Sequence, residues 1–212
     1  MKNVALWTDL EGRHFSVNEL KLPHLLPLIE GLDFPGQDPV ILDVGGGSRS
    51  LIEHADFGPE RRPAIGCIDI APSDIMHMTA SRVRHFRAEL DDLTSGRDPE
   101  TEGQLRGFLH RWGDPANPGA DAMVFSDVLN YVDYKQVLRW FDGCLKVGGF
   151  AAILNGVGRG FFTAFSDMGV QSDIELLDYC DGDLGYQQVQ AAHLPAPSEY
   201  GDVLLAAFQK IG

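Results

Sequence analysis

Short apolar runs recur along the chain and alternate with segments whose apolar side chains follow a helical spacing. The helical spacing is clearest over residues 101–112 and 133–145, where apolar side chains return every third or fourth position. The apolar runs cover residues 40–44, 64–70, 83–88, 122–125 and 150–154. Strands that alternate with helices in this way predict a mostly parallel α/β sheet.

The two ends of the chain depart from this alternation. Residues 17–32 carry leucines at helical spacing but contain Pro23 and Pro27, so we expect an interrupted helical segment. Apolar runs at 186–194 and 202–208 are joined by a short turn-like link, which suits an antiparallel pair.

No linker or internal repeat divides the chain, so we expect one domain over residues 1–212. Residues 1–39 would form an N-terminal helical segment. Residues 155–185, rich in glycine, would form an insertion over the carboxyl edge of the sheet, where ligands of such sheets bind.

A glycine-rich turn follows the first apolar run. Asp43 and Val44 end the run, and Gly45, Gly46 and Gly47 come directly after them. Glycine accepts a positive φ and has no Cβ, so a ligand can approach the backbone closely there. A short helix over residues 50–57 would point its unpaired N–H groups back at that ligand. The pattern predicts a nucleotide-binding turn.

Two classes of ligand compete for this turn. The dinucleotide pattern G-x-G-x-x-G places Ser50 at its third glycine, and this counts against a nicotinamide-dependent oxidoreductase. A phosphate-binding loop is excluded because no Gly-Lys-Ser/Thr follows. The carboxylate of Asp43 would repel a pyrophosphate, but it suits a ligand that carries an ammonium or sulfonium group.

Several segments in their order resemble the class I S-adenosylmethionine-dependent methyltransferases. Residues 42–47 are similar to motif I of that family, and Asp69, with Ile70 beside it, matches the acidic residue that binds the ribose. Glu89-Leu90 matches the acidic–apolar pair beside the adenine. Residues 126–131 resemble the segment that lines the methionine part and the substrate, and residues 145–149 resemble the Leu-Lys-Pro-Gly-Gly turn. The chain departs from the family at Arg49, where a glycine is common, and at Val147, where proline is usual.

The resemblance implies a Rossmann-like, seven-stranded, mostly parallel sheet with a C-terminal antiparallel hairpin and helices on both faces. It implies S-adenosyl-L-methionine as the cofactor, methyl transfer to oxygen or nitrogen of a small molecule, and residues 1–39 folded over the pocket. The implied cofactor-binding residues are Asp43, Gly45, Gly46, Gly47, Asp69, Ile70, Glu89, Leu90, Ser126 and Asp127.

Methyl transfer needs an aligned nucleophile, and a protonated hydroxyl or ammonium nucleophile also needs a base. The catalytic candidates are Asp127, Tyr131 and His193, and Asn130 and Asn155 are further candidates to line the pocket. Each catalytic candidate has a structural alternative. Asp127 could cap the following helix, Tyr131 could pack in the core, and His193 could hold its strand.

The amino-acid composition limits the classes of molecule that the protein is expected to bind. The chain has 31 acidic and 17 basic residues, a net charge of −14, which makes nucleic acid and anionic membranes poor partners. Three widely spaced cysteines without a CxxC pair suggest a cytoplasmic protein. We expect no metal, because Asp91-Asp92 and Asp181-Asp183 fall away from the methyl-transfer site and are better explained as solvated acidic loops. The sequence leaves open whether the protein is a homodimer. Two alternative functions also stay open: a protein that binds S-adenosylmethionine but catalyses another reaction or only regulates, and a protein methyltransferase with a basic target.

Overall fold

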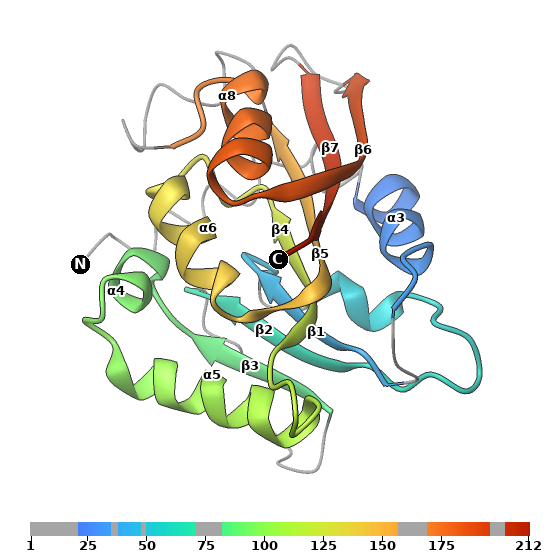
Figure 1. Ribbon diagram of the computed structural model, residues 1–212, viewed down its shortest axis with the longest axis vertical. Coiled ribbons are helices and arrows are strands. Elements are labelled where there is room, and N and C mark those ends of the chain that lie inside the picture. The colour runs from blue at the N-terminus through green and yellow to red at the C-terminus, as the bar shows by residue number, and fades with distance from the viewer. Residues whose placement is uncertain (1–20, 35–37, 48–49, 71–81, 157–168, 196–201) are drawn as a thin grey trace.

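A computed structural model of the chain describes residues 21–34, 38–47, 50–70, 82–156, 169–195 and 202–212. At its centre lies a seven-stranded sheet of order β3-β2-β1-β4-β5-β7-β6 (Figure 1). The first five strands pair in parallel, and β7 is antiparallel to both β5 and β6. The strands are β1 (Val40–Val44), β2 (Ala64–Asp69), β3 (Val83–Arg87), β4 (Ala120–Ser126), β5 (Leu145–Gly156), β6 (Tyr186–Pro195) and β7 (Asp202–Lys210). The predicted mostly parallel sheet with a C-terminal hairpin is confirmed.

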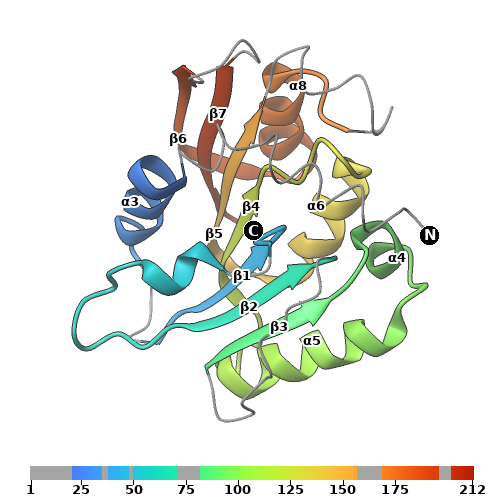
Figure 2. The ribbon, with the colours of Figure 1, turned by 180° about the vertical axis from the view of Figure 1, so that it is seen from behind.

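Helices cover both faces of this sheet, as Figures 1 and 2 show from opposite sides. One face carries α5, α6 and α8, and the other carries α3 and η2. The helical elements are η1 (Lys21–Leu25), α3 (Leu26–Glu30), η2 (Leu51–His54), α4 (Leu90–Thr94), α5 (Pro99–Trp112), α6 (Tyr134–Asp142), α8 (Asp173–Asp178) and η3 (Tyr179–Asp183). No helix within these described residues is both long and apolar enough to cross a bilayer.

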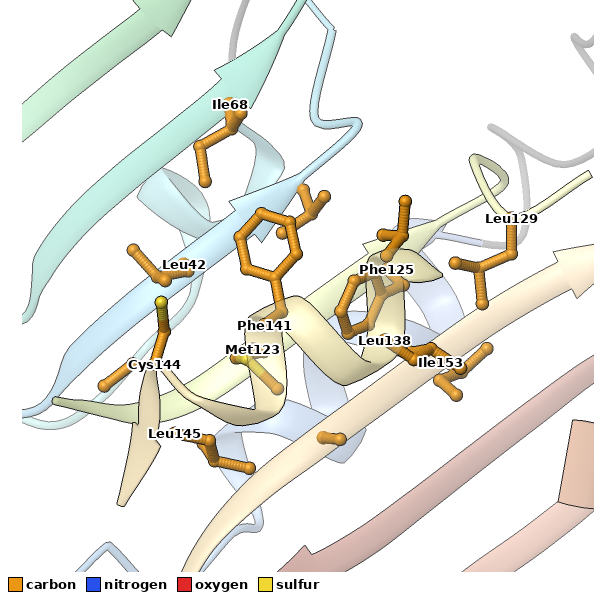
Figure 3. Packing of buried hydrophobic residues seen from close by; sticks show 14 of the residues in the cluster. Leu42, Ile68, Met123, Phe125, Leu129, Leu138, Phe141, Cys144, Leu145 and Ile153 are labelled. Atoms are coloured by element: carbon orange, nitrogen blue, oxygen red, sulfur yellow. The ribbon is translucent and has the colours of Figure 1, made fainter. Parts of the chain in front are cut away.

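The central strand β4 is buried on both faces, and its alternate side chains divide between two cores. Met123 and Phe125 face α6, whereas Val124 faces α3. Phe141 of α6 is fully buried and stacks edge-on against Phe125 (Figure 3). Burying a side chain of this size contributes about 2–3 kcal/mol. Packing on both faces therefore holds β4 rigid up to the point where its polar end begins.

Two predicted boundaries near α6 are wrong. The helix was expected to continue to residue 145, but it ends at Asp142, and Leu145 opens β5 instead. The expected turn at Gly148-Gly149 lies inside β5, which keeps its pairing with β4 through a register shift. Gly148 has a φ of +82°, a conformation that a side chain would strain.

The segment after the glycine turn also differs from expectation. A helix was predicted over residues 50–57, but the structure has only the single 3₁₀ turn η2. A turn of this length leaves no extended helix to direct N–H groups at a ligand, so that part of the prediction is wrong. Arg49 lies outside the described residues.

Candidate functional site

The carboxyl ends of the parallel strands meet at one edge of the sheet, and the strand order reverses direction between β1 and β4. Open α/β sheets bind ligands at such a switch point. Asp43 lies near the end of β1, Asp69 ends β2, Ser126 ends β4, and Asn155 lies near the end of β5. The topology therefore gathers most of the predicted site at one edge.

The glycine turn occupies this switch point. Gly45 and Gly47 have φ values of +78° and +75°, which only glycine adopts without strain. Gly47 N–H donates to Asp69 Oδ2 at 2.9 Å, which ties the turn to the end of β2. A Cβ on Gly45 would lie 2.5 Å from Cβ of Val128, so the turn packs directly on the loop after β4. The predicted need for glycine at residue 45 thus has a second cause, close packing within the protein.

Asp43 is buried beneath the turn. Ser50 Oγ donates to Asp43 Oδ2 at 2.5 Å and in turn accepts from Ile52 N–H at 3.2 Å, which caps η2. Burial raises the pKa of Asp43 to about 6, although the Ser50 hydrogen bond and the charge of Lys21 oppose the rise. The sequence showed Ser50 only as a missing third glycine, so its contact with Asp43 was missed.

We expect Ser50→Ala to lower the free energy of unfolding by about 1–2 kcal/mol at pH 8 and by less at pH 5. At pH 8 the Asp43 carboxylate is charged and loses its charge-assisted donor, whereas at pH 5 it is protonated. Urea unfolding at the two pH values measures this difference. Ser95→Ala, which removes an exposed hydroxyl at the C-cap of α4, is the control. An equal loss at both pH values would show that the bond does not act on the charged carboxylate.

The end of β4 holds the predicted catalytic pair. Asp127 has a φ of +54°, and among the described residues it is the one non-glycine residue with positive φ. Its N–H donates to Leu154 O at 2.7 Å, which fixes the backbone. Strain of this kind costs about 1–3 kcal/mol and gathers at functional sites. The alternative role as helix cap is wrong, because Asp133 caps α6 by accepting from Gln136 N–H at 3.1 Å.

Burial raises the pKa of Asp127 to about 7, and the Lys21 charge and the Gly156 backbone N–H oppose the rise. A carboxyl group with this pKa changes its proton near neutral pH, as a general base should. Tyr131 is buried, and its burial and the negative charge of Asp127 raise the pKa of its phenol, so that it stays protonated. The structure therefore brings Asp127 and Tyr131 into one electrostatic site.

His193 lies farther along the same edge. It pairs with Leu204 of β7, which pairs with Asn155 of β5, so His193 lies two strands beyond β5. Its Nε2 is 2.7 Å from Asp173 Oδ2, and about half of its side chain is exposed (49%). This side-chain contact holds β6 to α8.

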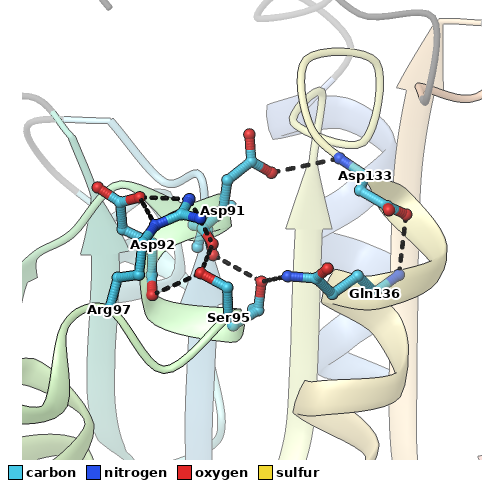
Figure 4. A network of polar contacts seen from close by, with 8 residues as sticks. Asp91, Asp92, Ser95, Arg97, Asp133 and Gln136 are labelled. Atoms are coloured by element: carbon cyan, nitrogen blue, oxygen red, sulfur yellow. Dashed lines mark hydrogen bonds and ion pairs between the residues drawn. The ribbon is translucent and has the colours of Figure 1, made fainter. Parts of the chain in front are cut away.

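Glu89 and Leu90, predicted to lie beside the adenine, are found where α4 begins after β3. Leu90 is buried and opens α4, directly after Glu89. Asp91, predicted to lie in a solvated loop, belongs to this helix and accepts from Asp133 N–H at 3.3 Å (Figure 4). Gln136 of α6 also donates to the α4 hydroxyl Thr94 Oγ1 at 2.9 Å. These contacts join α4 to the start of α6, beside the loop that carries Asp127.

Sequence reasoning missed one cation of the site. The charge of Lys21 in η1 acts on both Asp43 and Asp127, and no motif in the sequence marks it. Ile70 directly follows β2 and is half-buried. Residues 1–20 and 157–168 lie outside the described part of the chain, so the predicted placement of the N-terminal segment and the insertion over the pocket stays a prediction.

In sequence, no family model and no curated protein matches the chain. In structure, it is similar to a Burkholderia thailandensis 1,6-didemethyltoxoflavin-N1-methyltransferase crystallised with S-adenosylhomocysteine (TM-score 0.55, 15% identity, 98% of this chain and 81% of that chain). It is also similar to the N-methyltransferase NodS from Bradyrhizobium japonicum WM9 (TM-score 0.55, 14% identity, 95% and 96%). A putative methyltransferase in complex with the Haloferax volcanii Trm112 activator gives a TM-score of 0.61 at 13% identity (99% and 94%). With its strand order, this likeness shows that the chain has the fold of the class I S-adenosylmethionine-dependent methyltransferases.

Proposed function

We propose that this protein is an S-adenosylmethionine-dependent methyltransferase that acts on oxygen or nitrogen of a small molecule. The observation that carries the proposal is the glycine turn at the β1–β4 switch point, with two positive φ values and its Gly47 N–H held by Asp69. The N-methyltransferases that share the fold support this reading. The three cysteines are free and buried, which fits a cytoplasmic protein.

The residues at the sheet edge fit this cofactor. Ser126 Oγ is buried without a hydrogen-bond partner among the described residues, as expected where a bound group supplies one. Asp43 would face the ammonium of the methionine part, and Asp69 with Ile70 would hold the ribose. Glu89 and Leu90 would lie beside the adenine.

When bound, the cofactor supplies a methyl group on an electrophilic sulfonium. The residues of the chain then have to align the acceptor and remove its proton. The Asp127 carboxylate would take that proton, and the protonated Tyr131 hydroxyl would donate a hydrogen bond within the same site. His193 would serve as a base only for an acceptor long enough to reach across β5 and β7.

Calorimetry with S-adenosylmethionine and with NAD tests the cofactor. We expect binding of S-adenosylmethionine alone, and at least a tenfold weaker affinity for Asp69→Ala, because one or two charge-assisted hydrogen bonds are lost. Asp178→Ala, an exposed carboxylate on α8, is the control. Unchanged affinity in Asp69→Ala would contradict the ribose assignment, and binding of NAD instead would favour an oxidoreductase.

Transfer of a labelled methyl group from S-adenosylmethionine to a panel of phenols and amines tests the activity. We expect label in at least one acceptor. A protein that binds the cofactor but labels none of the small molecules would favour a silent binder, and label in a basic protein alone would favour a protein methyltransferase.

A further inference from the structure

The backbone of Gly156, the last residue of β5, joins three side chains, one from β5 itself and two from the loop after β4. Its carbonyl oxygen accepts from Asn130 Nδ2 at 3.1 Å and from Asn155 Nδ2 at 3.1 Å. Asn155 Nδ2 also donates to Asn130 Oδ1 at 2.8 Å, so the two amides bind each other as well. On its other side, the Gly156 N–H donates to the Asp127 carboxylate. One glycine therefore connects the buried amide pair to the predicted base.

The two amides are fully enclosed. Asn130 is 2% exposed and Asn155 is 0% exposed. Asn155 Oδ1 has no hydrogen-bond donor among the described residues, and a buried acceptor left in this way destabilises the fold. An apolar side chain of the same size would avoid that penalty. The amide at residue 155 is therefore better explained by what its Nδ2 group holds than by stability.

The loop that carries Asp127 is fixed by contacts on either side of this network. Val170 N–H donates to Leu129 O at 3.2 Å, and Gly169 lies so close to the Asn130 backbone that a Cβ would collide with it. Asn130 therefore cannot shift unless the segment that carries Gly169 and Val170 moves with it. The amide pair consequently fixes the distance between the end of β5 and the loop after β4.

We propose that Asn130 and Asn155 are positioning residues, which hold Gly156 so that its backbone N–H engages the Asp127 carboxylate and aims it at the methyl acceptor. The proposal rests on the function proposed above. The other groups that act on Asp127 are Lys21 of η1, which stabilises its charge, and the neutral phenol of Tyr131. The hydrogen bond from the Gly156 N–H stabilises the charged carboxylate. If that N–H is no longer aligned with the carboxylate, the pKa of Asp127 should therefore rise.

The test is a ¹³C NMR titration of the aspartate carboxyl groups in the protein without cofactor, with the Asp127 signal assigned through Asp127→Asn. We expect the pKa of Asp127 to rise by about one unit in Asn155→Leu and in Asn130→Ala, as for the loss of one hydrogen bond to a charged group. The matched control is Ile153→Val, a core change on the same strand and face. Its Asp127 titration should equal that of the wild type.

The wild-type protein supplies a second measurement that does not depend on whether the two asparagine variants fold. The amide proton of Gly156 should shift with the same midpoint as Asp127, and Asp127→Asn should abolish this shift. A Gly156 signal that does not follow Asp127, or an unchanged Asp127 pKa in both folded amide variants, would overturn the proposal. Failure to bind S-adenosylmethionine would contradict the proposed function alone, because these titrations need no ligand.

Discussion

Gly45→Ala is expected to weaken S-adenosylmethionine binding by more than about 100-fold, a loss of about 2.7 kcal/mol. The left-handed backbone at residue 45 alone costs alanine about 1–2 kcal/mol. The new Cβ would also lie 2.5 Å from Cβ of Val128, where carbon atoms normally stay about 3.5–4 Å apart. Since Cβ of valine belongs to a stiff side chain, the turn itself has to move away from the loop after β4. Calorimetry measures the loss of affinity.

Gly58→Ala is the matched control for this variant. Gly58 has a φ of +83°, close to that of Gly45, but a Cβ there would meet nothing within 4 Å. The control therefore pays the same backbone penalty without a collision, and we expect it to lose stability while it keeps its cofactor affinity. If both variants bind equally well, contact between the turn and Val128 does not shape the site.

The parts of the site that were predictable are those that a short stretch of sequence specifies. An apolar run that ends in Asp43 and three glycines predicts a strand and a ligand turn without any knowledge of distant residues. Parallel neighbours that end at the same edge also bring Asp69, predicted to bind the ribose, beside the turn. Its hydrogen bond with Gly47 N–H was not predicted.

The remaining contacts depend on distances that only the folded chain sets. The Ser50–Asp43 bond needs the chain to turn back after the glycines, and the Asn130–Asn155 pair joins residues 25 positions apart. The early end of α6 had a local signal, because Gly143 directly follows its last helical residue. The apolar spacing that reached Leu145 outweighed that signal in the prediction.

The short helix α4 was missed for a related reason. Its five residues are fewer than periodicity can detect, and its two aspartates read as a solvated loop. Acidic residues in a first helical turn are favourable, however, because they complement the positive end of the helix dipole. Asp91 and Asp92 fit that position better than the loop assigned to them.

Asp127→Asn is expected to reduce methyl transfer at pH 8 by about 10²–10⁴-fold, the usual contribution of a general base. In the wild type the rate should rise with pH through a midpoint of about 7, because Asp127 accepts a proton only when ionised. The variant should lack this rise. Initial rates between pH 5.5 and 8.5, with the acceptor found in the panel above, measure both effects, and a variant that keeps the wild-type pH profile would exclude Asp127 as the base.

Asp127→Asn should also be more stable than the wild type at pH 8, the pH at which it loses activity. The pKa of Asp127 is higher in the folded protein than in the unfolded chain, so its ionisation destabilises the fold as pH rises from about 4 to about 7. Asparagine removes that cost, so we expect the free energy of unfolding of Asp127→Asn at pH 8 to exceed that of the wild type by about 2–4 kcal/mol, up to the full difference between the two pKa values. At pH 4 the difference should be small. Asp133→Asn, a change at the cap of α6, should show no such gain. A residue that lowers stability at neutral pH yet raises the rate is held at the end of β4 for its chemistry.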